Sequence, residues 1–276
     1  MARKNIFEII AENNDIEDDI KRIDKLSKML SISNGIENYS LVEFVDEYCF
    51  KNWSYGKYFI DLQDFIDTLG LNFSDINDYL NRVELFYNLW KIADKYLNED
   101  SEYKYYNNFT TLHDIMFKVL AQLNHKIYYD EKEEKALVIE DKPEVTSVAE
   151  IVDDNLSMDV IRYNHHSLKG DIEKKKTILL KFANDLESKR KLLDQKDKDL
   201  ATNIFSLLNN MNLRHNNCTE GDKCYNEVVA QMTDEELENW YDELYQMILL
   251  AYLELDNIDR NRRVEELRKR YSKKGK

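Results

Sequence analysis

The chain has 276 residues, of which 43% are hydrophobic and 12% aromatic, so it can bury a sizeable core although 34% of its residues are charged. Its formal net charge of −15 disfavours broad binding to nucleic acid, and no apolar run approaches the length that crosses a bilayer, so we expect no membrane partner. The first 20 residues lack the apolar core of a signal peptide, and the three cysteines do not form a disulfide framework, which predicts a cytoplasmic protein.

The N-terminal half is predicted to be mostly helical. One proline and six glycines favour long helices with few tight turns. Apolar residues recur at helical spacing over residues 5–30, and Ser33-Asn34-Gly35 then predicts a turn. Ser40 can cap a following helix together with Glu43, the partner in a capping box. Further helices are predicted over 58–69, 76–97 and 109–124, with a polar loop over 98–108.

The spacing of apolar residues changes after residue 124, from the helical period to the alternation of a β-strand. The segment HKIYYDEKEEKALVIEDKP starts at His125 and places two short β-like runs around a charged stretch, which predicts a β-hairpin near 125–140. Two strands alone are marginally stable, so we expect the hairpin to pack on helices. A domain boundary is expected near it, giving an N-terminal region of residues 1–150 and a C-terminal region of residues 151–276.

The C-terminal region is predicted to be purely helical. Apolar spacing predicts helices over 157–168, 172–193, 200–213 and from Thr233, which fits a capping box with Glu236, to about Tyr271. Four such helices make a bundle. The predicted fold class is therefore mainly α, with a C-terminal helical bundle, an N-terminal helical region and one small β-hairpin.

Polar side chains crowd the segment NNMNLRHNNCTEGDKCY, which runs from Asn209 to Tyr225. Its amide, guanidinium and imidazole groups belong to Asn209, Asn210, Asn212, Arg214, His215, Asn216 and Asn217. One interpretation is a helix C-terminus, where Asn tolerates the left-handed conformation and a cation meets the negative end of the helix dipole. The other is a phosphate-binding site, because a solvated loop needs few such side chains. Chemistry alone favours the helix end.

The C-terminal region resembles the HEPN superfamily, and abortive-infection proteins of bacterial phage defence in particular. The resemblance is carried by LLNNMNLRHNN at 207–217 and by the long helix EELENWYDELYQMILLAYLELD at 235–256, and it covers about 157–271. It implies a metal-independent ribonuclease that needs no cofactor, binds RNA and works as a homodimer. The resemblance also implies an arginine that holds the scissile phosphate and, about four to six residues later, a histidine that assists attack by the ribose 2′-OH.

Arg214 matches that arginine, and His215 matches the polar residue that often follows it. The expected later histidine is missing, because Thr219, Glu220 and Gly221 occupy its positions. Either His215 or Glu220 would then transfer the proton, or the protein is not a nuclease. The residues expected to contact RNA are Asn209, Asn212, Asn216, Asn217, Arg162 and His166. Arg162 and His166 are included because an offset of four residues lets them share a helix face.

A metal site is the weaker alternative for this cluster. His215, Cys218 and Cys224 could supply three ligands, but their spacing is irregular and no C-x-x-C pair is present. We therefore expect no metal.

The end of the chain is locally basic. Residues 260–276 contain nine Lys and Arg residues against two glutamates. This segment is either a solvated helix end or a phosphate-contacting arm. Two functions stay open: an RNA-cleaving or RNA-binding defence protein, and a non-catalytic interaction or regulatory protein built on the same bundle, with a protein partner in a defence system.

Overall fold

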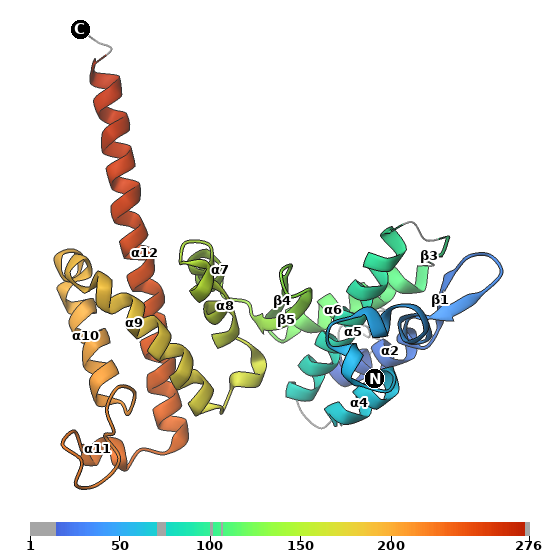
Figure 1. The fold of residues 1–276 in the computed structure, drawn as a ribbon, viewed down its shortest axis with the longest axis horizontal. Helices are drawn as coiled ribbons and strands as arrows, with labels where there is room; N and C mark the ends of the chain where they lie inside the picture. The colour runs from blue at the N-terminus through green and yellow to red at the C-terminus, as the bar shows by residue number, and fades with distance from the viewer. Residues whose placement is uncertain (1–14, 71–75, 100–101, 106, 274–276) are drawn as a thin grey trace, which may run out of the picture. The chain divides into compact units, whose positions relative to one another are not determined.

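The computed structural model describes residues 15–70, 76–99, 102–105 and 107–273, without the side chains of 77, 107, 108, 272 and 273. The described part is mainly α-helical, as predicted, and it divides into two compact units, one up to Asp141 and one from Lys142 (Figure 1). The helix predicted over 5–30 lies partly outside the described residues. Its described part is α2, Ile16–Ser27, which Asp15 caps by accepting the backbone N–H of Glu17.

The first unit contains short and long helices that begin and end at recognisable signals. They are α3 (Leu41–Phe44), η1 (Val45–Cys49), η2 (Phe50–Asn52), η3 (Gly56–Tyr58), α4 (Leu62–Leu69), α5 (Ile76–Asn98) and α6 (Asn107–Gln122). The predicted capping box is confirmed, since Ser40 and Glu43 each accept the other's backbone N–H. Gly70 ends α4 in the left-handed conformation, with φ of 62°. That helix starts four residues later than predicted because Asp61 caps it.

A small three-stranded sheet was missed by the sequence analysis. It contains β1 (Leu30–Ser33), β2 (Asn38–Ser40) and β3 (Lys104–Tyr105) in the antiparallel order β2-β1-β3. The turn at Ser33-Asn34-Gly35 joins β1 to β2, and Ile32 pairs with Tyr105. The polar segment 98–108 was predicted to be a loop, but this distant pairing gives Lys104 and Tyr105 a strand conformation, and α6 already begins at Asn107.

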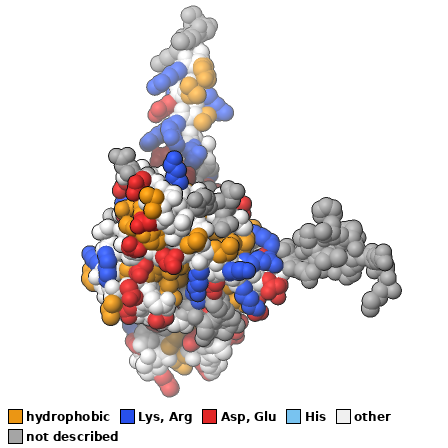
Figure 2. All heavy atoms as spheres, turned by 90° about the vertical axis from the view of Figure 1, so that its right-hand side faces the viewer, with side chains coloured by type: hydrophobic (Ala, Val, Ile, Leu, Met, Phe, Trp, Pro, Cys, Tyr) orange, Lys and Arg blue, Asp and Glu red, His pale blue; other side chains and the backbone are white. Residues whose placement is uncertain are grey.

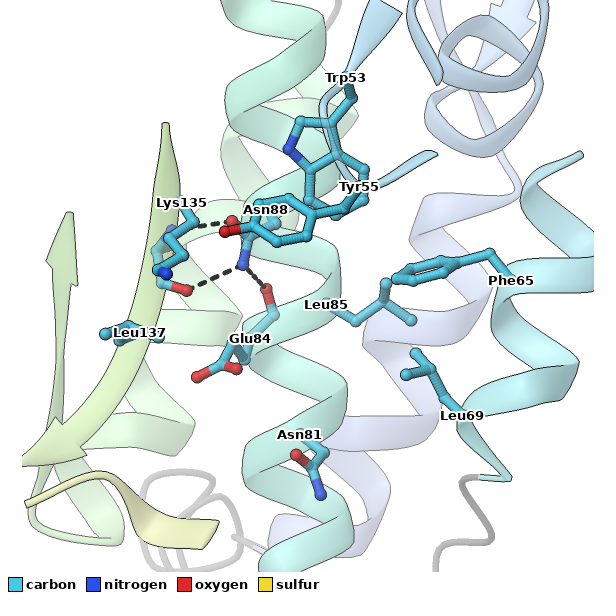
Figure 3. Close-up of a pocket in the computed structure, with 11 residues that line it drawn as sticks. Trp53, Tyr55, Phe65, Leu69, Asn81, Glu84, Leu85, Asn88, Lys135 and Leu137 are labelled. Atoms are coloured by element: carbon cyan, nitrogen blue, oxygen red, sulfur yellow. Dashed lines mark hydrogen bonds between the residues drawn. The ribbon is translucent and has the colours of Figure 1, made fainter. Parts of the chain in front are cut away.

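The predicted hairpin is confirmed as β4 (His125–Asp130) and β5 (Lys135–Glu140). The hairpin packs on α5 partly through polar contacts. Side chains of α5 make hydrogen bonds to the backbone along the outer edge of β5 (Figure 3). The Asn88 amide group donates to the Ala136 carbonyl at 3.0 Å and accepts the Ala136 N–H at 2.8 Å. The Glu84 carboxylate accepts the Val138 N–H at 2.6 Å. A strand edge that would otherwise be open is therefore closed by a helix.

The core of the first unit is shared by α2, β1, α3, η1, η2, α5, α6 and β5. Its fully buried side chains include Ile23, Ile32, Leu41, Phe44, Val45, Phe50, Val83, Leu89, Ala93, Met116, Val119 and Val138. Because Ile32 of β1 and Val138 of β5 belong to the same buried cluster as the helical side chains, the small sheet and the hairpin are held by helix packing rather than by their own length.

The second unit is the predicted helical bundle. It contains α7 (Pro143–Ala149), α8 (Asp154–Tyr163), η4 (His166–Leu168), α9 (Ile172–Lys196), α10 (Lys198–Asn210), α11 (Glu227–Ala230) and α12 (Asp234–Lys273). Helix α7 was not predicted. The helix predicted over 157–168 is shorter than expected, because α8 ends at Tyr163 and a separate 3-10 turn follows.

Helix α12 has 40 residues and changes character along its length. Thr233 and Glu236 form the predicted capping box at its start. Its first half packs against α7, α9 and α10, and its buried side chains run from Leu237 to Tyr252. Its second half continues past α9 and α10, and none of its described side chains is fully buried (Figure 1). None of the described helices is both long enough and apolar enough to span a membrane.

Candidate functional site

The candidate site lies where α10 ends and the polar loop of residues 211–226 begins. Asn212 has φ of 54°, in the left-handed region, and the backbone N–H of Arg214 donates to the Leu208 carbonyl at 3.0 Å. These are features of a helix C-terminus, so that interpretation of the segment is confirmed at Asn212. The helix ends at Asn210, three residues before the predicted end.

Asn217 is buried inside the polar loop and makes hydrogen bonds to several of its backbone groups. Its side chain is buried, with a relative exposure of 1% for the residue. The Asn217 side-chain oxygen accepts the Asn212 N–H at 2.8 Å, and its amide nitrogen donates to the Cys224 carbonyl at 2.7 Å. The Asn217 carbonyl accepts the Asn226 N–H at 2.9 Å. Two residues that were predicted to contact RNA, Asn212 and Asn217, therefore bond to each other and to the loop backbone.

Arg214 is engaged by its own chain. One guanidinium nitrogen lies 2.7 Å from the Glu187 carboxylate, and another donates to the Ala183 carbonyl at 3.1 Å. Both acceptors belong to α9, and the guanidinium carbon also lies 5.5 Å from the centre of the Phe205 ring of α10. The Arg214 side chain is only 21% exposed. It thus fastens the polar loop to α9 and α10, and the planar donor fork that would bind a phosphate already holds a carboxylate.

The other predicted catalytic residues are exposed and do not contact Arg214. His215 and Glu220 are exposed, and no hydrogen bond or ion pair joins either of them to Arg214. Asn216 accepts the backbone N–H groups of Cys218 and Thr219, which makes a local turn. Asn209 is half-buried on α10. The structure therefore brings together Arg214 with Glu187, and Asn212 with Asn217, but it does not assemble Arg214, His215 and Glu220 into one constellation.

Arg162 and His166 do not share a helix face, so that prediction is wrong. Arg162 lies in the last turn of α8, whereas His166 lies in η4 beyond the end of that helix. The break follows from His165, whose ring nitrogen caps η4 by accepting the Ser167 N–H. His166 is 5% exposed, so its ring is packed inside the protein rather than presented to a ligand.

The three candidate metal ligands of the polar loop do not converge. The ligand atoms of His215, Cys218 and Cys224 do not all come within 4.8 Å of one another. The Cys218 sulfur instead lies 4.0 Å from the Val229 carbonyl oxygen.

A depression of about 670 Å³ in the second unit borders the polar loop. Asn212 and Cys218 line it together with Tyr241 of α12 and the start of α9 at Asp171 and Glu173. The Tyr241 hydroxyl is buried and has no hydrogen-bond partner among the described residues. Burial is the main cause that raises the pKa of this phenol, and Glu173 adds to the shift. Asn212 is the residue of the predicted RNA-binding set that lines this depression.

The sequence analysis missed a charged cluster between α9 and α12, in which the lysine is buried and the two carboxylates, Glu238 and Asp242, are 14% and 48% exposed. Lys175 of α9 is 5% exposed, and its ammonium lies 2.7 Å from the carboxylates of both Glu238 and Asp242 on α12. The Tyr163 hydroxyl donates to Asp242 at 2.9 Å, and its ring stacks on Tyr245 at 3.9 Å. Burial acts to raise the pKa of the Glu238 carboxyl, but hydrogen bonds from Lys175 and the Gly170 N–H outweigh it and lower that pKa. The helical spacing of apolar residues predicts which face of each helix points inward. It does not predict which lysine on one helix pairs with which carboxylate on another.

The first unit has a mostly apolar pocket of about 210 Å³ (Figure 3). Trp53, Tyr55 and Phe65 face Leu85 and the start of β5 across it. The Trp53 indole N–H is buried without a hydrogen-bond partner among the described residues. The pocket thus offers an aromatic wall and one unused donor, and of its two charged side chains, Glu84 and Lys135, the Glu84 carboxylate already accepts the Val138 N–H.

Comparisons with known proteins give no relative. No family model matches this chain, and neither a curated protein nor a solved structure does so.

Proposed function

We propose that this protein is a non-catalytic helical interaction protein, a HEPN-like bundle that does not cut RNA and that acts in the cytoplasm on a protein partner within a defence system. The observation that carries the proposal is the engagement of Arg214 by Glu187 and the Ala183 carbonyl. A guanidinium in this arrangement must lose a carboxylate and a carbonyl before it can bind a phosphate, and both losses cost free energy.

The polar loop supports the same conclusion. Asn217 is buried, and its side-chain hydrogen bonds go to backbone groups of the loop. Asn216 shapes a turn. The density of amide side chains that suggested a phosphate site is thereby explained by the need to fix an irregular backbone between α10 and α12.

A metal-independent ribonuclease is the second candidate, and one observation favours it. Arg190 lies 3.5 Å from Glu187, so two arginines surround one glutamate and leave an excess positive charge beside the exposed His215. If a dimer partner or an RNA phosphate displaced Glu187, Arg214 could hold the scissile phosphate, with His215 or Glu220 transferring the proton. Homodimerisation through the bundle, with Arg214 near the interface, stays a prediction that light scattering tests.

The experiment that separates the two candidates is an RNA-cleavage assay in EDTA. The full chain is incubated with single-stranded RNA beside the Arg214→Ala and His215→Ala variants. We expect the same background level of breakdown in all three samples. Cleavage by the wild type that leaves 2′,3′-cyclic phosphate ends and is lost in Arg214→Ala would overturn the proposal and establish the ribonuclease.

A further inference from the structure

The second half of α12 is exposed, and no described element covers it from Asp259 to Tyr271. Every side chain from Asp259 to Tyr271 is exposed, and the last buried one on this helix is Tyr252. The helix continues for about 30 Å beyond that tyrosine at 1.5 Å per residue. A lone helical segment of this length is marginal in water, so a partner that covers one of its faces would stabilise it.

One face of this segment is apolar. Val264, Leu267 and Tyr271 follow one another at spacings of three and four residues, with relative exposures of 45%, 46% and 67%. Continued back toward the bundle, the same spacing meets Arg260 and Asn257 before it reaches Leu253 and Leu250, so the apolar run is confined to Val264, Leu267 and Tyr271. We call these three residues the apolar stripe. It follows the alternating three- and four-residue rhythm of a coiled-coil seam, in which Asn257 and Arg260 are polar positions.

The borders of the apolar stripe are basic. At 100° per residue, Arg263 and Arg268 fall within about 75° of the middle of the stripe, whereas Glu265 and Glu266 fall more than about 125° away; Arg260 continues the seam itself. The end of α12 at the top of Figure 2 shows Lys and Arg side chains next to hydrophobic ones. Arg263 and Arg268 have no ion-pair partner among the described residues, while Arg260 and Arg262 pair with Asp256 and Asp259 of their own helix.

This arrangement disfavours a parallel second copy of the chain. In a parallel coiled coil, Arg263 would face Arg268 of the other copy, and Arg260 would stack on itself in the seam. Like charges in these positions oppose pairing, while carboxylates opposite them would favour it. We infer that the apolar stripe is a docking site for a partner helix that carries an apolar seam bordered by Asp and Glu. This inference rests on the proposed function and names the surface that performs it.

The test uses a synthetic acidic helix as the probe. A fluorescein-labelled peptide of about three heptads carries Leu at both seam positions and Glu at all bordering positions, so that it repels itself. Its binding to the full chain is followed by fluorescence anisotropy at about 0.15 M salt. Two variants are compared: Arg263→Glu/Arg268→Glu at the borders of the stripe, and Arg262→Glu/Lys269→Glu on the opposite face. Both change the net charge by the same amount, and circular dichroism checks that both keep the helix.

We expect the wild type to bind the peptide, the border variant to bind it at least about tenfold more weakly, and the opposite-face variant to change affinity by less than about twofold. Leu267→Ser should also weaken binding, because it interrupts the seam. This pattern requires a defined face rather than a general attraction between opposite charges.

Three outcomes would overturn the inference. The first is no binding up to about 100 µM peptide. The second is an equal loss in the two charge variants, which points to a polyanion; single-stranded RNA and anionic vesicles run in parallel would identify it. The third is self-association of the wild type that Leu267→Ser abolishes, which makes a second copy the occupant. RNA cleavage in EDTA would defeat the proposed function instead, and it would leave the peptide result standing.

Discussion

The side-chain amide of Asn88 makes with Ala136 the pair of hydrogen bonds that a neighbouring strand would make. Its nitrogen donates to the Ala136 carbonyl, its oxygen accepts the Ala136 N–H, and the whole arrangement is buried. A helix side chain thereby replaces a strand at the edge of the hairpin (Figure 3). The same amide nitrogen also donates to the Glu84 carbonyl of its own helix.

Asn88→Ala should destabilise the first unit by about 2–3 kcal/mol, because it leaves a buried N–H and a buried carbonyl of Ala136 without partners. The measurement is urea unfolding followed by tryptophan fluorescence, with hydrogen exchange of the β5 peptide as a local readout. Asn81→Ala is the matched control: Asn81 lies two turns earlier on α5 and makes no side-chain hydrogen bond in the described structure. Equal effects of the two variants would contradict the strand-like role of Asn88.

Replacing Lys175 should be among the most damaging changes in the second unit. Lys175→Met keeps the length of the side chain but removes the cation between Glu238 and Asp242, and we expect a loss of about 3 kcal/mol near neutral pH. Lys174→Met is the control, because the Lys174 side chain is 70% exposed and its partner, Asp171, is 30% exposed. A loss in Lys175→Met no larger than in Lys174→Met would contradict this interpretation.

The stability of the second unit should also fall in acid. The pKa of Glu238 is lowered in the folded protein, so its ionised form stabilises the fold above the unfolded pKa, and this contribution disappears as the pH falls through the lower folded pKa. We therefore expect the stability difference between wild type and Lys175→Met to be largest at neutral pH and to shrink below about pH 4.5. Urea unfolding of both proteins between pH 7 and 3 measures it. A difference that is constant over this range would show that the Glu238 carboxylate does not depend on Lys175.

The ion pair of Arg214 should contribute modestly to stability, because the Glu187 side chain is 48% exposed. Arg214→Ala loses this pair, the bond to Ala183 and the contact with Phe205, for about 1–2 kcal/mol; Glu187→Gln loses only the charge, for less than about 1 kcal/mol. Arg262→Ala, in a fully exposed ion pair on α12, should change almost nothing. No loss of stability in Arg214→Ala would mean that Arg214 is free in solution, which would strengthen the ribonuclease hypothesis.

Two of the three thiols, those of Cys49 and Cys218, should differ sharply in reactivity. Cys49 is buried, and burial raises the pKa of its thiol to about 12, whereas Cys218 is exposed. A disulfide reagent at pH 8 should therefore label Cys218 rapidly and Cys49 only after denaturation, because the thiolate is the reacting form. Counting thiols before and after adding guanidinium, in wild type and Cys49→Ser, measures this difference. Rapid labelling of Cys49 in the native protein would show that the first unit opens easily around η1.

The sequence predicted what depends on neighbouring residues. The helix starts were predicted correctly from the capping boxes of Ser40 with Glu43 and of Thr233 with Glu236. Gly70 predicted a helix end, and the alternating pattern after His125 predicted the hairpin. Each of these signals involves groups within one or two turns of each other. Features made by distant residues were missed.

The pairing of Ile32 with Tyr105 joins segments more than 70 residues apart, and the sequence of neither segment indicates which segment it pairs with. The candidate site failed to be predicted for the same reason. The sequence shows the polar residues that neighbour Arg214 in the chain, but Glu187 lies on α9 and is not one of them. The ion pair with Glu187 engages the Arg214 guanidinium. The sequence shows which functional groups are present. The packing of the bundle determines which groups they bond to.

The continuity of α12 has a mechanical consequence. Tyr245, on the buried half of this helix, donates to the Val160 carbonyl and accepts the Asn164 amide, and the same rod reaches Tyr271 without a kink-forming proline or glycine. From Tyr252 to Tyr271 the rod extends for roughly 29 Å, so a load applied at its tip acts with a long lever arm on the contacts of Tyr245. A torque on the far end of α12 is therefore carried to the hydrogen bonds that Tyr245 makes with Val160 and Asn164 at the junction between α8 and α12.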